Sequence, residues 1–250
     1  MTNRYFGLIT KVEPMDSGVG HLQDLFSEAK RATTWEICLH SFGLSLNDGL
    51  NSLGMLRGML SKRKVVLTHR PGYKNGQWPR PYDRWKFWQE LPPWLTKLIK
   101  DRKTEVFVDW ELDLIRWTTD NGVKPIIPWS KVGASHHDFE GGRNAGYLGR
   151  YLKYLRATKA RAFLKLIVTA KSTEDCEVLK AVPRFYMGDS RPLIFLAMGE
   201  KGKESMRKGL AWGSAGIYGY LPERESADPA RLSVDELRGD PSIKKILSRV

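Results

Sequence analysis

Long apolar segments are missing from this chain of 250 residues. The longest uninterrupted apolar run is about as long as "PLIFLAM" at 192–198, whereas a helix that crosses a bilayer needs about 20 mainly apolar residues. The sequence therefore excludes a membrane-spanning helix. The opening segment, "MTNRYFGLITKVEP", also lacks a charged region followed by an apolar one, so we expect no secretory signal.

Cysteine is almost absent as well. The chain has two cysteines, Cys38 and Cys176, whose separation matches no metal-binding pattern, and it contains no Asn-x-Ser/Thr sequon. Proteins of oxidising compartments commonly carry disulfide frameworks. We therefore expect this protein to work in a reducing cytoplasm.

Acidic residues are in the minority: 28 Asp and Glu face 41 Lys and Arg, and the formal net charge is +13. Such a charge suits either nucleic acid or small anionic metabolites. The basic residues are spread along the chain, with modest clusters only at 62–64, 201–208 and 244–245. No zinc-finger spacing, RNA-recognition signature or basic zipper accompanies them. We therefore expect a small-molecule substrate and do not favour nucleic acid or a membrane as a partner.

Short apolar runs with strand-forming residues recur at a fairly even interval. Segments with apolar residues every three or four positions, such as 21–32 and 145–158, separate most of them. Eight runs are candidate strands: residues 5–10, 34–39, 64–69, 105–110, 131–136, 163–168, 192–198 and 215–220.

Strands that alternate with helices form right-handed βαβ units and a parallel sheet. Eight such units in 250 residues predict a (β/α)8 barrel, an α/β fold whose active site lies at the carboxyl ends of the strands. No linker marks a boundary, so we expect a single domain over 1–250. Residues 238–250 have apolar side chains at helical spacing after a proline, and we expect them to form a closing helix.

Lys165 stands in the middle of the sixth candidate strand, "FLKLIV". Barrel strands are covered on both sides, so a polar residue within one is hydrogen-bonded, paired or functional. Burial beside cationic neighbours lowers the pKa of a lysine and makes it a nucleophile toward carbonyl carbon. The alternative is a lysine whose stem is buried while its ammonium group reaches the barrel rim.

Glu111 and His137 follow the fourth and fifth candidate strands directly. The two spacings, from Glu111 to His137 and from His137 to Lys165, each correspond to about one βα unit. The three side chains are therefore expected side by side at one end of the barrel. A lysine that forms an imine, a histidine that moves protons and a carboxylate that orients the histidine form a coherent catalytic set.

His136 and His137 are adjacent in "SHHDF", although the chain has only five histidines. Three alternatives to a catalytic role remain open at this point. The pair could lie in a solvated turn, pack in the core, or form half of a metal site.

These residues resemble the motifs of type I 3-dehydroquinate dehydratases, including the version fused into the fungal pentafunctional shikimate-pathway polypeptide. The resemblance runs from about residue 30 to residue 240. Its main motifs are "VDWELDL" at 108–114, "ASHHDF" at 134–139, "FLKLIV" at 163–168, "AMGEKGKES" at 197–205 and "RLSVDELR" at 231–238.

The resemblance implies a mechanism that needs no metal or organic cofactor. Lys165 forms a Schiff base with the C3 ketone of 3-dehydroquinate, and His137 removes a C2 proton and helps to expel the C1 hydroxyl as water. Glu111 holds His137 in its orientation and tautomer, while His136 and Asp138 support the site. Members of the family are often dimers, so the resemblance allows a homodimer.

The substrate-binding positions both match and depart from the family pattern. Glu36 and Arg70 are kept, but Cys38 and Met206 stand where the family has arginines, the second of which binds the substrate carboxylate. In the closing loop Ser226 is kept, and Arg231 stands near the place of a glutamine. Losing a buried arginine that pairs with a carboxylate costs several kcal/mol unless another cation replaces it. We therefore expect Arg231, or Arg207 after a local helix shift, to supply that charge.

Two functions of different classes follow from these observations. The first is an active dehydratase of the shikimate or quinate pathway, which the intact Lys165, His137 and Glu111 favour. The second is a barrel with an altered ligand or lost turnover, acting as a quinate-pathway sensor or regulatory module. Cys38 and Met206 favour this alternative.

Overall fold

The computed structural model describes residues 6–12, 27–39, 57–70, 79–141, 144–221 and 231–248. Much of the helical segment expected at 21–32 lies outside these ranges, as does Ser226. Within the described part, no helix is both long and apolar enough to cross a bilayer.

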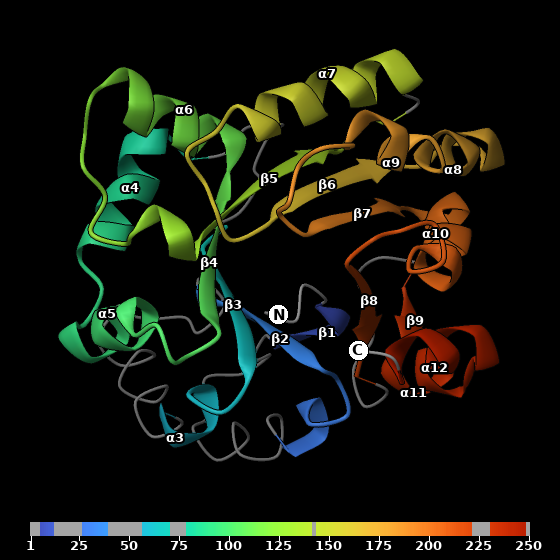
Figure 1. The fold of residues 1–250 in the computed structure, drawn as a ribbon, viewed down its shortest axis with the longest axis horizontal. Helices are drawn as coiled ribbons and strands as arrows, with labels where there is room; N and C mark the ends of the chain where they lie inside the picture. The colour runs from blue at the N-terminus through green and yellow to red at the C-terminus, as the bar shows by residue number, and fades with distance from the viewer. Residues whose placement is uncertain are drawn as a thin grey trace.

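Parallel strands form the centre of the molecule and curl into a ring (Figure 1). The order along the sheet is β7-β6-β5-β4-β3-β2-β1-β8-β9, and every hydrogen-bonded pair of strands is parallel. The strands are β1 (Gly7–Val12), β2 (Thr34–Cys38), β3 (Lys64–Thr68), β4 (Val106–Glu111), β5 (Val132–Asp138), β6 (Leu164–Thr169), β7 (Leu193–Met198), β8 (Gly216–Tyr220) and β9 (Leu232–Ser233).

The ring closes between β7 and β8. The backbone N–H of Ala215, just before β8, donates to the carbonyl of Leu193 at 2.7 Å, and the N–H of Phe195 donates to Ser214 Oγ at 3.0 Å. The prediction of a (β/α)8 barrel is confirmed, and β1 to β8 match the eight candidate strands to within two residues.

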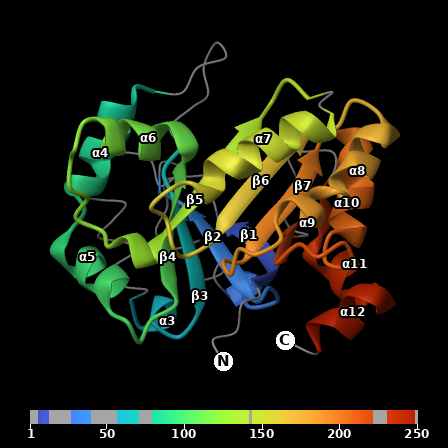
Figure 2. The ribbon, with the colours of Figure 1, turned by 45° about the horizontal axis from the view of Figure 1, so that its top comes forward.

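Helices cover the outside of the ring (Figure 2). They are α3 (Arg57–Leu60), α4 (Pro81–Gln89), α5 (Pro93–Lys100), α6 (Leu112–Asp120), α7 (Ala145–Arg156), α8 (Thr173–Leu179), α9 (Val182–Phe185), α10 (Lys203–Lys208), α11 (Val234–Gly239) and α12 (Pro241–Leu247). Short 3-10 turns occupy Trp129–Lys131 and Glu200–Gly202. The tail expected to form a closing helix contains α12, which buries Ile243.

The sequence of α7 explains both its start and its packing. Asn144 caps the helix, since its side chain accepts a hydrogen bond from the N–H of Tyr147 at 2.9 Å. Leu148, Leu152 and Leu155 recur at helical spacing and are fully buried. One face of α7 therefore covers the sheet, and the expected helix at 145–158 is found.

Aromatic residues pack inside the ring toward the amino-terminal ends of the strands. The rings of Phe6 and Phe163 meet edge to face, with centroids 5.0 Å apart. Gly133 lies against Phe163, so a Cβ at that position would approach the ring to 2.2 Å. These rings form an apolar layer inside the barrel, and Lys165, Glu36 and Asp109 lie on the side of it nearer the carboxyl ends of the strands.

Candidate active site

A cavity of about 210 Å³ opens at the carboxyl-terminal end of the barrel. Strands β1, β2, β5, β6, β7 and β8 all contribute side chains to it, as expected for a site in this fold. The described residues that line it are Lys11, Glu36, Cys38, Arg70, His137, Phe139, Lys165, Ile167, Leu196, Met198, Met206, Tyr218 and Arg231.

Lys165 points from β6 into the ring and is only 2% exposed. Its Nζ donates hydrogen bonds to Glu36 Oε2 at 2.8 Å and to Asp109 Oδ2 at 3.3 Å. Nζ also lies 4.7 Å from the ring centroid of Tyr218. The ammonium is thus held inside the barrel, so the alternative of a lysine that reaches the rim is wrong.

Two acidic side chains are the nearest charged neighbours of Lys165. They are the carboxylates of Glu36 and Asp109, both fully shielded from solvent. Carboxylates stabilise an ammonium ion in a buried position. The guanidinium group of Arg70 contacts the same two carboxylates.

Arg70 follows β3 and connects three acidic side chains. Its Nη1 lies 3.4 Å from Glu36 Oε1, its Nε donates to Glu111 Oε1 at 3.2 Å, and its Nη2 contacts Asp109. A guanidinium group offers several N–H donors in a fixed plane, which suits it to several carboxylates at once. Arg70 therefore acts as the centre of a buried ionic network.

Glu36 receives hydrogen bonds from two sides, because Tyr218 donates to the same Oε2 atom that Lys165 contacts. Burial raises the pKa of Glu36, but Lys165 and Arg70 outweigh that effect and hold it well below its ordinary value. Burial and the charge of Glu36 raise the pKa of Tyr218 well above its ordinary value. Glu36 is thus an anion and Tyr218 a neutral donor.

His137 points into the cavity from β5, and its Nδ1 lies 2.5 Å from Glu111 Oε1. Burial lowers the pKa of His137, with Arg70 and Lys165 acting in the same direction, while Glu111 opposes them. Burial acts to raise the pKa of Glu111, yet His137 and Arg70 hold it far below the ordinary value. The pair therefore presents a neutral imidazole, oriented by a carboxylate, to the cavity.

His136 faces the opposite side of β5. Its ring stacks on Tyr151 of α7 with centroids 3.8 Å apart, and its Nε2 lies 3.5 Å from the hydroxyl of Tyr147. Burial lowers the pKa of His136 to about 4. His136 is therefore partly buried between β5 and α7, whereas His137 belongs to the cavity. Among the described residues, no group of three or more His, Cys, Asp or Glu side chains could hold a metal ion.

Asp138 shapes the end of β5. Its Oδ1 accepts hydrogen bonds from the backbone N–H groups of Glu140 at 3.1 Å and Gly141 at 3.4 Å. Gly141 has φ of 68°, and a Cβ there would lie 2.2 Å from the carbonyl oxygen of Thr169. The tight turn after β5 therefore depends on both residues.

Cys38 and Met206 both line the cavity and are buried. The hydroxyl of Thr68 donates to Cys38 Sγ at 3.4 Å. Neither position carries a charge, so the part of the wall that they form cannot pair with an anion.

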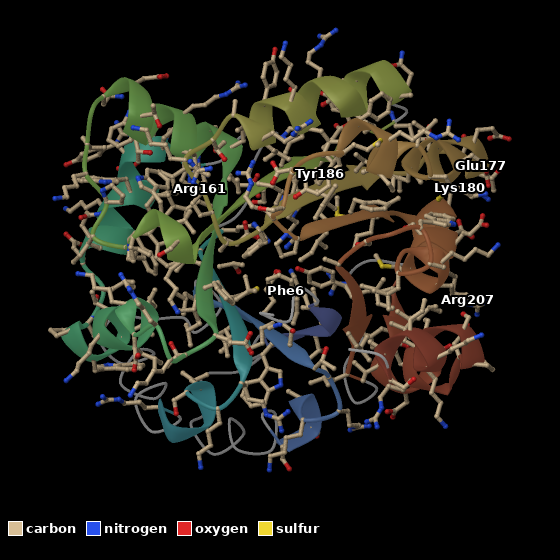
Figure 3. All side chains as sticks on the ribbon, in the orientation of Figure 1. Phe6, Arg161, Glu177, Lys180, Tyr186 and Arg207 are labelled. Atoms are coloured by element: carbon tan, nitrogen blue, oxygen red, sulfur yellow. The ribbon has the colours of Figure 1, made fainter. Side chains whose placement is uncertain are left out.

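Arg231 and Arg207 lie in different places. Arg231 lines the cavity, and its Nε is buried with no hydrogen-bond partner in the described structure. Arg207 is exposed on α10 and points away from the barrel (Figure 3), toward the charges of Glu236 and Asp240. A shift of one residue along a helix turns the side chain by about 100°. The structure therefore does not bring Arg207 to the cavity.

Residues of the motif "MGEKGKES" hold α10 against the end of β7 through hydrogen bonds and close packing. Ser205 Oγ donates to Gly202 O at 2.7 Å and accepts from the N–H of Ala197 at 2.8 Å. A Cβ at Gly202 would lie 2.4 Å from Ala197 O. These contacts fix the helix that carries Met206 against the cavity.

Sequence reasoning missed three residues of this site. Asp109 stands in "VFVDW" and is as polar an intruder in a buried strand as Lys165, so the same argument could have found it. Tyr218 and Lys11 face the cavity from β8 and β1. Nothing in their local sequence distinguishes them from rim or core residues.

Comparisons with known proteins place this chain in a family. The family model described as type I 3-dehydroquinase matches residues 21–245. A 3-dehydroquinate dehydratase of Latilactobacillus sakei is 36% identical over 110 residues, which make up 44% of this chain and 45% of that relative. The matched segment thus spans less than half of the relative's length.

Solved structures share the fold. The 3-dehydroquinate dehydratase of Geobacillus kaustophilus matches with a TM-score of 0.70 at 19% identity, over 97% of this chain and 91% of the other. The type I enzyme of Clostridium difficile, solved with covalent modified comenic acid, matches with a TM-score of 0.69 at 18% identity, over 99% of this chain and 94% of the other.

Proposed function

Because this chain belongs to the family of type I 3-dehydroquinases, we propose that it is an active 3-dehydroquinate dehydratase, a hydro-lyase that works through a Schiff base. One observation carries the proposal. The buried amine of Lys165 shares a cavity with the imidazole of His137, which faces the carboxylate of Glu111 at 2.5 Å. Amine, proton carrier and orienting carboxylate are the groups that this chemistry requires.

The reaction begins with Lys165. One ammonium proton passes to the imidazole of His137, and the neutral amine adds to the C3 carbonyl carbon of the substrate. His137 then returns the proton to the hydroxyl of the carbinolamine, which leaves as water as the iminium ion forms. The carboxylates of Glu36 and Asp109 stabilise the positive charge that remains on this nitrogen.

His137 moves the protons. Its neutral imidazole takes a proton from C2, and the electron pair of that C–H bond passes toward the iminium nitrogen to give an enamine. The enamine then expels the C1 hydroxyl, which His137 protonates so that it leaves as water. Hydrolysis of the remaining iminium ion releases 3-dehydroshikimate and restores Lys165. Burial supports this role, because it keeps His137 unprotonated near neutral pH.

Arg231 is proposed to bind the substrate carboxylate in place of the arginine that Met206 replaces. Arg70 and Lys165 are already paired with carboxylates, whereas Arg231 forms no ion pair with any residue in the described ranges. A carboxylate that enters the cavity would meet the buried Nε of Arg231 and form a charge-assisted hydrogen bond. Glu36 and Arg70 are proposed to contact the substrate hydroxyls, and Ser226 is a further candidate for substrate binding.

Borohydride trapping tests the proposed chemistry. The protein is mixed with 3-dehydroquinate, reduced and analysed by mass spectrometry, while the ultraviolet absorbance of the conjugated product is followed. We expect product formation and a reduced adduct on Lys165, and neither with Lys165→Met. An adduct without product would overturn the proposal of an active enzyme and favour the sensor alternative. Absence of an adduct would overturn the Schiff-base mechanism.

Arg231 is tested separately by two substitutions. Arg231→Gln removes the charge and is expected to raise KM for 3-dehydroquinate at least tenfold, while Arg231→Lys retains part of the affinity. The control is Arg207→Gln, which removes an equal charge outside the cavity. Unchanged affinity in Arg231→Gln would show that another cation binds the carboxylate.

A further inference from the structure

A second cavity lies at the other end of the barrel, where the strands begin. Its volume is about 570 Å³, against about 210 Å³ for the cavity of Lys165, and the two share no lining residue. Phe6 lies just before β1, Lys131 just before β5 and Pro192 just before β7, and all three line it. Figure 3 shows Phe6 near the middle of the ring of strands.

Positive charge dominates the wall of this cavity. Five of the described residues that line it are lysine or arginine, and Glu105 is the one acidic residue among them. Lys64 lies 3.4 Å from Glu105, and Arg191 pairs with Asp189 at 2.5 Å. These two ion pairs neutralise Lys64 and Arg191. Three of the five cations keep their charge.

Arg102 and Arg161 are two of these remaining cations. Both are exposed at the cavity, and neither forms an ion pair with any residue in the part of the chain that the structure describes. Like-charged side chains gathered at one opening repel one another, which costs free energy unless an anion joins them.

Lys131 is the third cation of this cavity that keeps its charge. It is buried, with 7% of its surface exposed. Its Nζ donates to the carbonyl oxygen of Thr104 at 2.6 Å and lies 5.4 Å from the ring centroid of Phe107. An ammonium has three N–H donors, and a carbonyl and a ring give it no full counter-charge. Burial lowers the pKa of Lys131, although Asp101 and Glu105 oppose this. A bound anion would stabilise the charged form.

The floor of the cavity is aromatic. The rings of Phe6 and Phe107 lie 6.1 Å apart at an interplanar angle of 60°, and Pro192 lines the same space. Phosphate or sulfate would gain nothing from such a floor, whereas a flat apolar ring would bury its surface there.

The cavity continues sideways past Arg161. A neighbouring cavity of about 590 Å³ shares Arg161, Ser190 and Arg191 with it and is lined also by Arg156 and Lys153 near the end of α7. The positive potential therefore extends from the mouth of the barrel across its surface, and this would draw anions toward the opening.

We propose that the amino-terminal end of the barrel binds a small organic anion with a flat apolar ring. Its carboxylate or phosphate group lies among Lys131, Arg102 and Arg161, and its ring packs against Phe6 and Phe107. The site is separate from the cavity of Lys165, and the proposal stands independently of the proposed reaction.

Calorimetric titration with three probes tests it. Phenyl phosphate and benzoate carry a ring with two kinds of charged group, and inorganic phosphate carries no ring. We expect one or both of the ring compounds to bind at least tenfold more tightly than inorganic phosphate, and the tighter of the two identifies the preferred charged group. The proposal would be overturned if inorganic phosphate bound as tightly as the ring compounds, or if neither ring compound bound.

Three variants locate the bound probe. Arg161→Gln, an exposed substitution that should leave folding intact, is expected to weaken binding about tenfold. Arg80→Gln removes an equal charge from a side chain that is 82% exposed and lines neither cavity, and should bind as the unmodified protein does. Arg231→Gln, in the other cavity, should also bind normally. Unchanged binding in Arg161→Gln, or loss of binding in Arg231→Gln, would contradict the assignment.

Discussion

Lys165 donates a hydrogen bond of 2.8 Å to Glu36, a residue 129 positions away in the sequence and on the opposite part of the ring. Both side chains are shielded from solvent, and Asp109 and Arg70 join them in one network. The cations Lys165 and Arg70 both contact the carboxylates of Glu36 and Asp109. Removing one cation leaves buried negative charge without compensation.

Lys165→Met is therefore expected to destabilise the fold by about 3 kcal/mol, although methionine fills a similar volume. Adding Glu36→Gln removes one uncompensated carboxylate, so the double variant should be more stable than Lys165→Met alone. Urea denaturation at pH 7 measures both. If the two substitutions destabilise additively, Lys165 and Glu36 are not coupled in the way the structure indicates.

Tyr218→Phe removes the hydroxyl that donates to Glu36 and keeps the ring beneath Lys165. Glu36 then loses one of the donors that fix its position, and the amine it holds is less well placed. A hydrogen bond to a charged group contributes about 1.5 to 3 kcal/mol. Because Lys165 still holds Glu36, we expect only part of this loss to reach the reaction, with a fall in kcat of about fivefold and a smaller change in KM. Tyr220→Phe on the same strand but outside the cavity is the matched control. Equal kinetics in the two variants would assign Tyr218 a purely structural role.

The strands and the grouping of Glu111, His137 and Lys165 at one end of the barrel were predictable because both follow from local pattern. Buried parallel strands appear as apolar runs, and the spacing of Glu111, His137 and Lys165 follows the repeat of the barrel. The partners of Lys165 were not predictable, since Asp109 and Glu36 lie 56 and 129 positions away and reach it only through the curvature of the sheet.

The two candidate arginines show a second limit of prediction from the sequence. Arg231 was the first candidate in sequence and Arg207 was a candidate only after a local helix shift, because the direction in which α10 faces depends on how Gly202 and Ser205 dock against β7. That docking buries Met206 and turns Arg207 outward. The packing of a helix must therefore be known before one of its residues can be assigned to a site.

The pH dependence of the proposed reaction should report His137. Because its pKa is lowered from the ordinary value of 6.5, the imidazole stays neutral below that pH, and kcat/KM should fall only at more acidic pH. Glu111 opposes this lowering, so Glu111→Gln should move the acidic limb to still lower pH while reducing kcat about a hundredfold through loss of orientation. A limb that moves toward higher pH would contradict this account of the pair.

His136 should make the stability of the fold depend on pH. Its pKa is about 4 in the folded protein against an ordinary value of 6.5, so the unfolded chain binds more protons between these values. The stability that the neutral form of His136 contributes is present above pH 6.5 and is lost as the pH falls toward 4, by about 3 kcal/mol in all. His136→Phe keeps a ring against Tyr151 and removes the titration. Urea unfolding of both proteins at pH 7.5 and 5 should therefore show a smaller loss in the variant; an equal loss would assign the effect to other groups.

Gly133→Ala tests the aromatic packing beneath the site. A Cβ at this position would approach the ring of Phe163 to 2.2 Å, and that ring is fully buried against Phe6. Since the ring has no free space to enter, we expect a loss of about 2 to 3 kcal/mol in unfolding free energy. Phe163→Leu combined with Gly133→Ala should recover part of it, because a smaller side chain makes room for the methyl group. Thermal or urea denaturation of the two single variants and the double variant gives the comparison. Additive losses would mean that the strain lies in the backbone of β5 and not in the contact with Phe163.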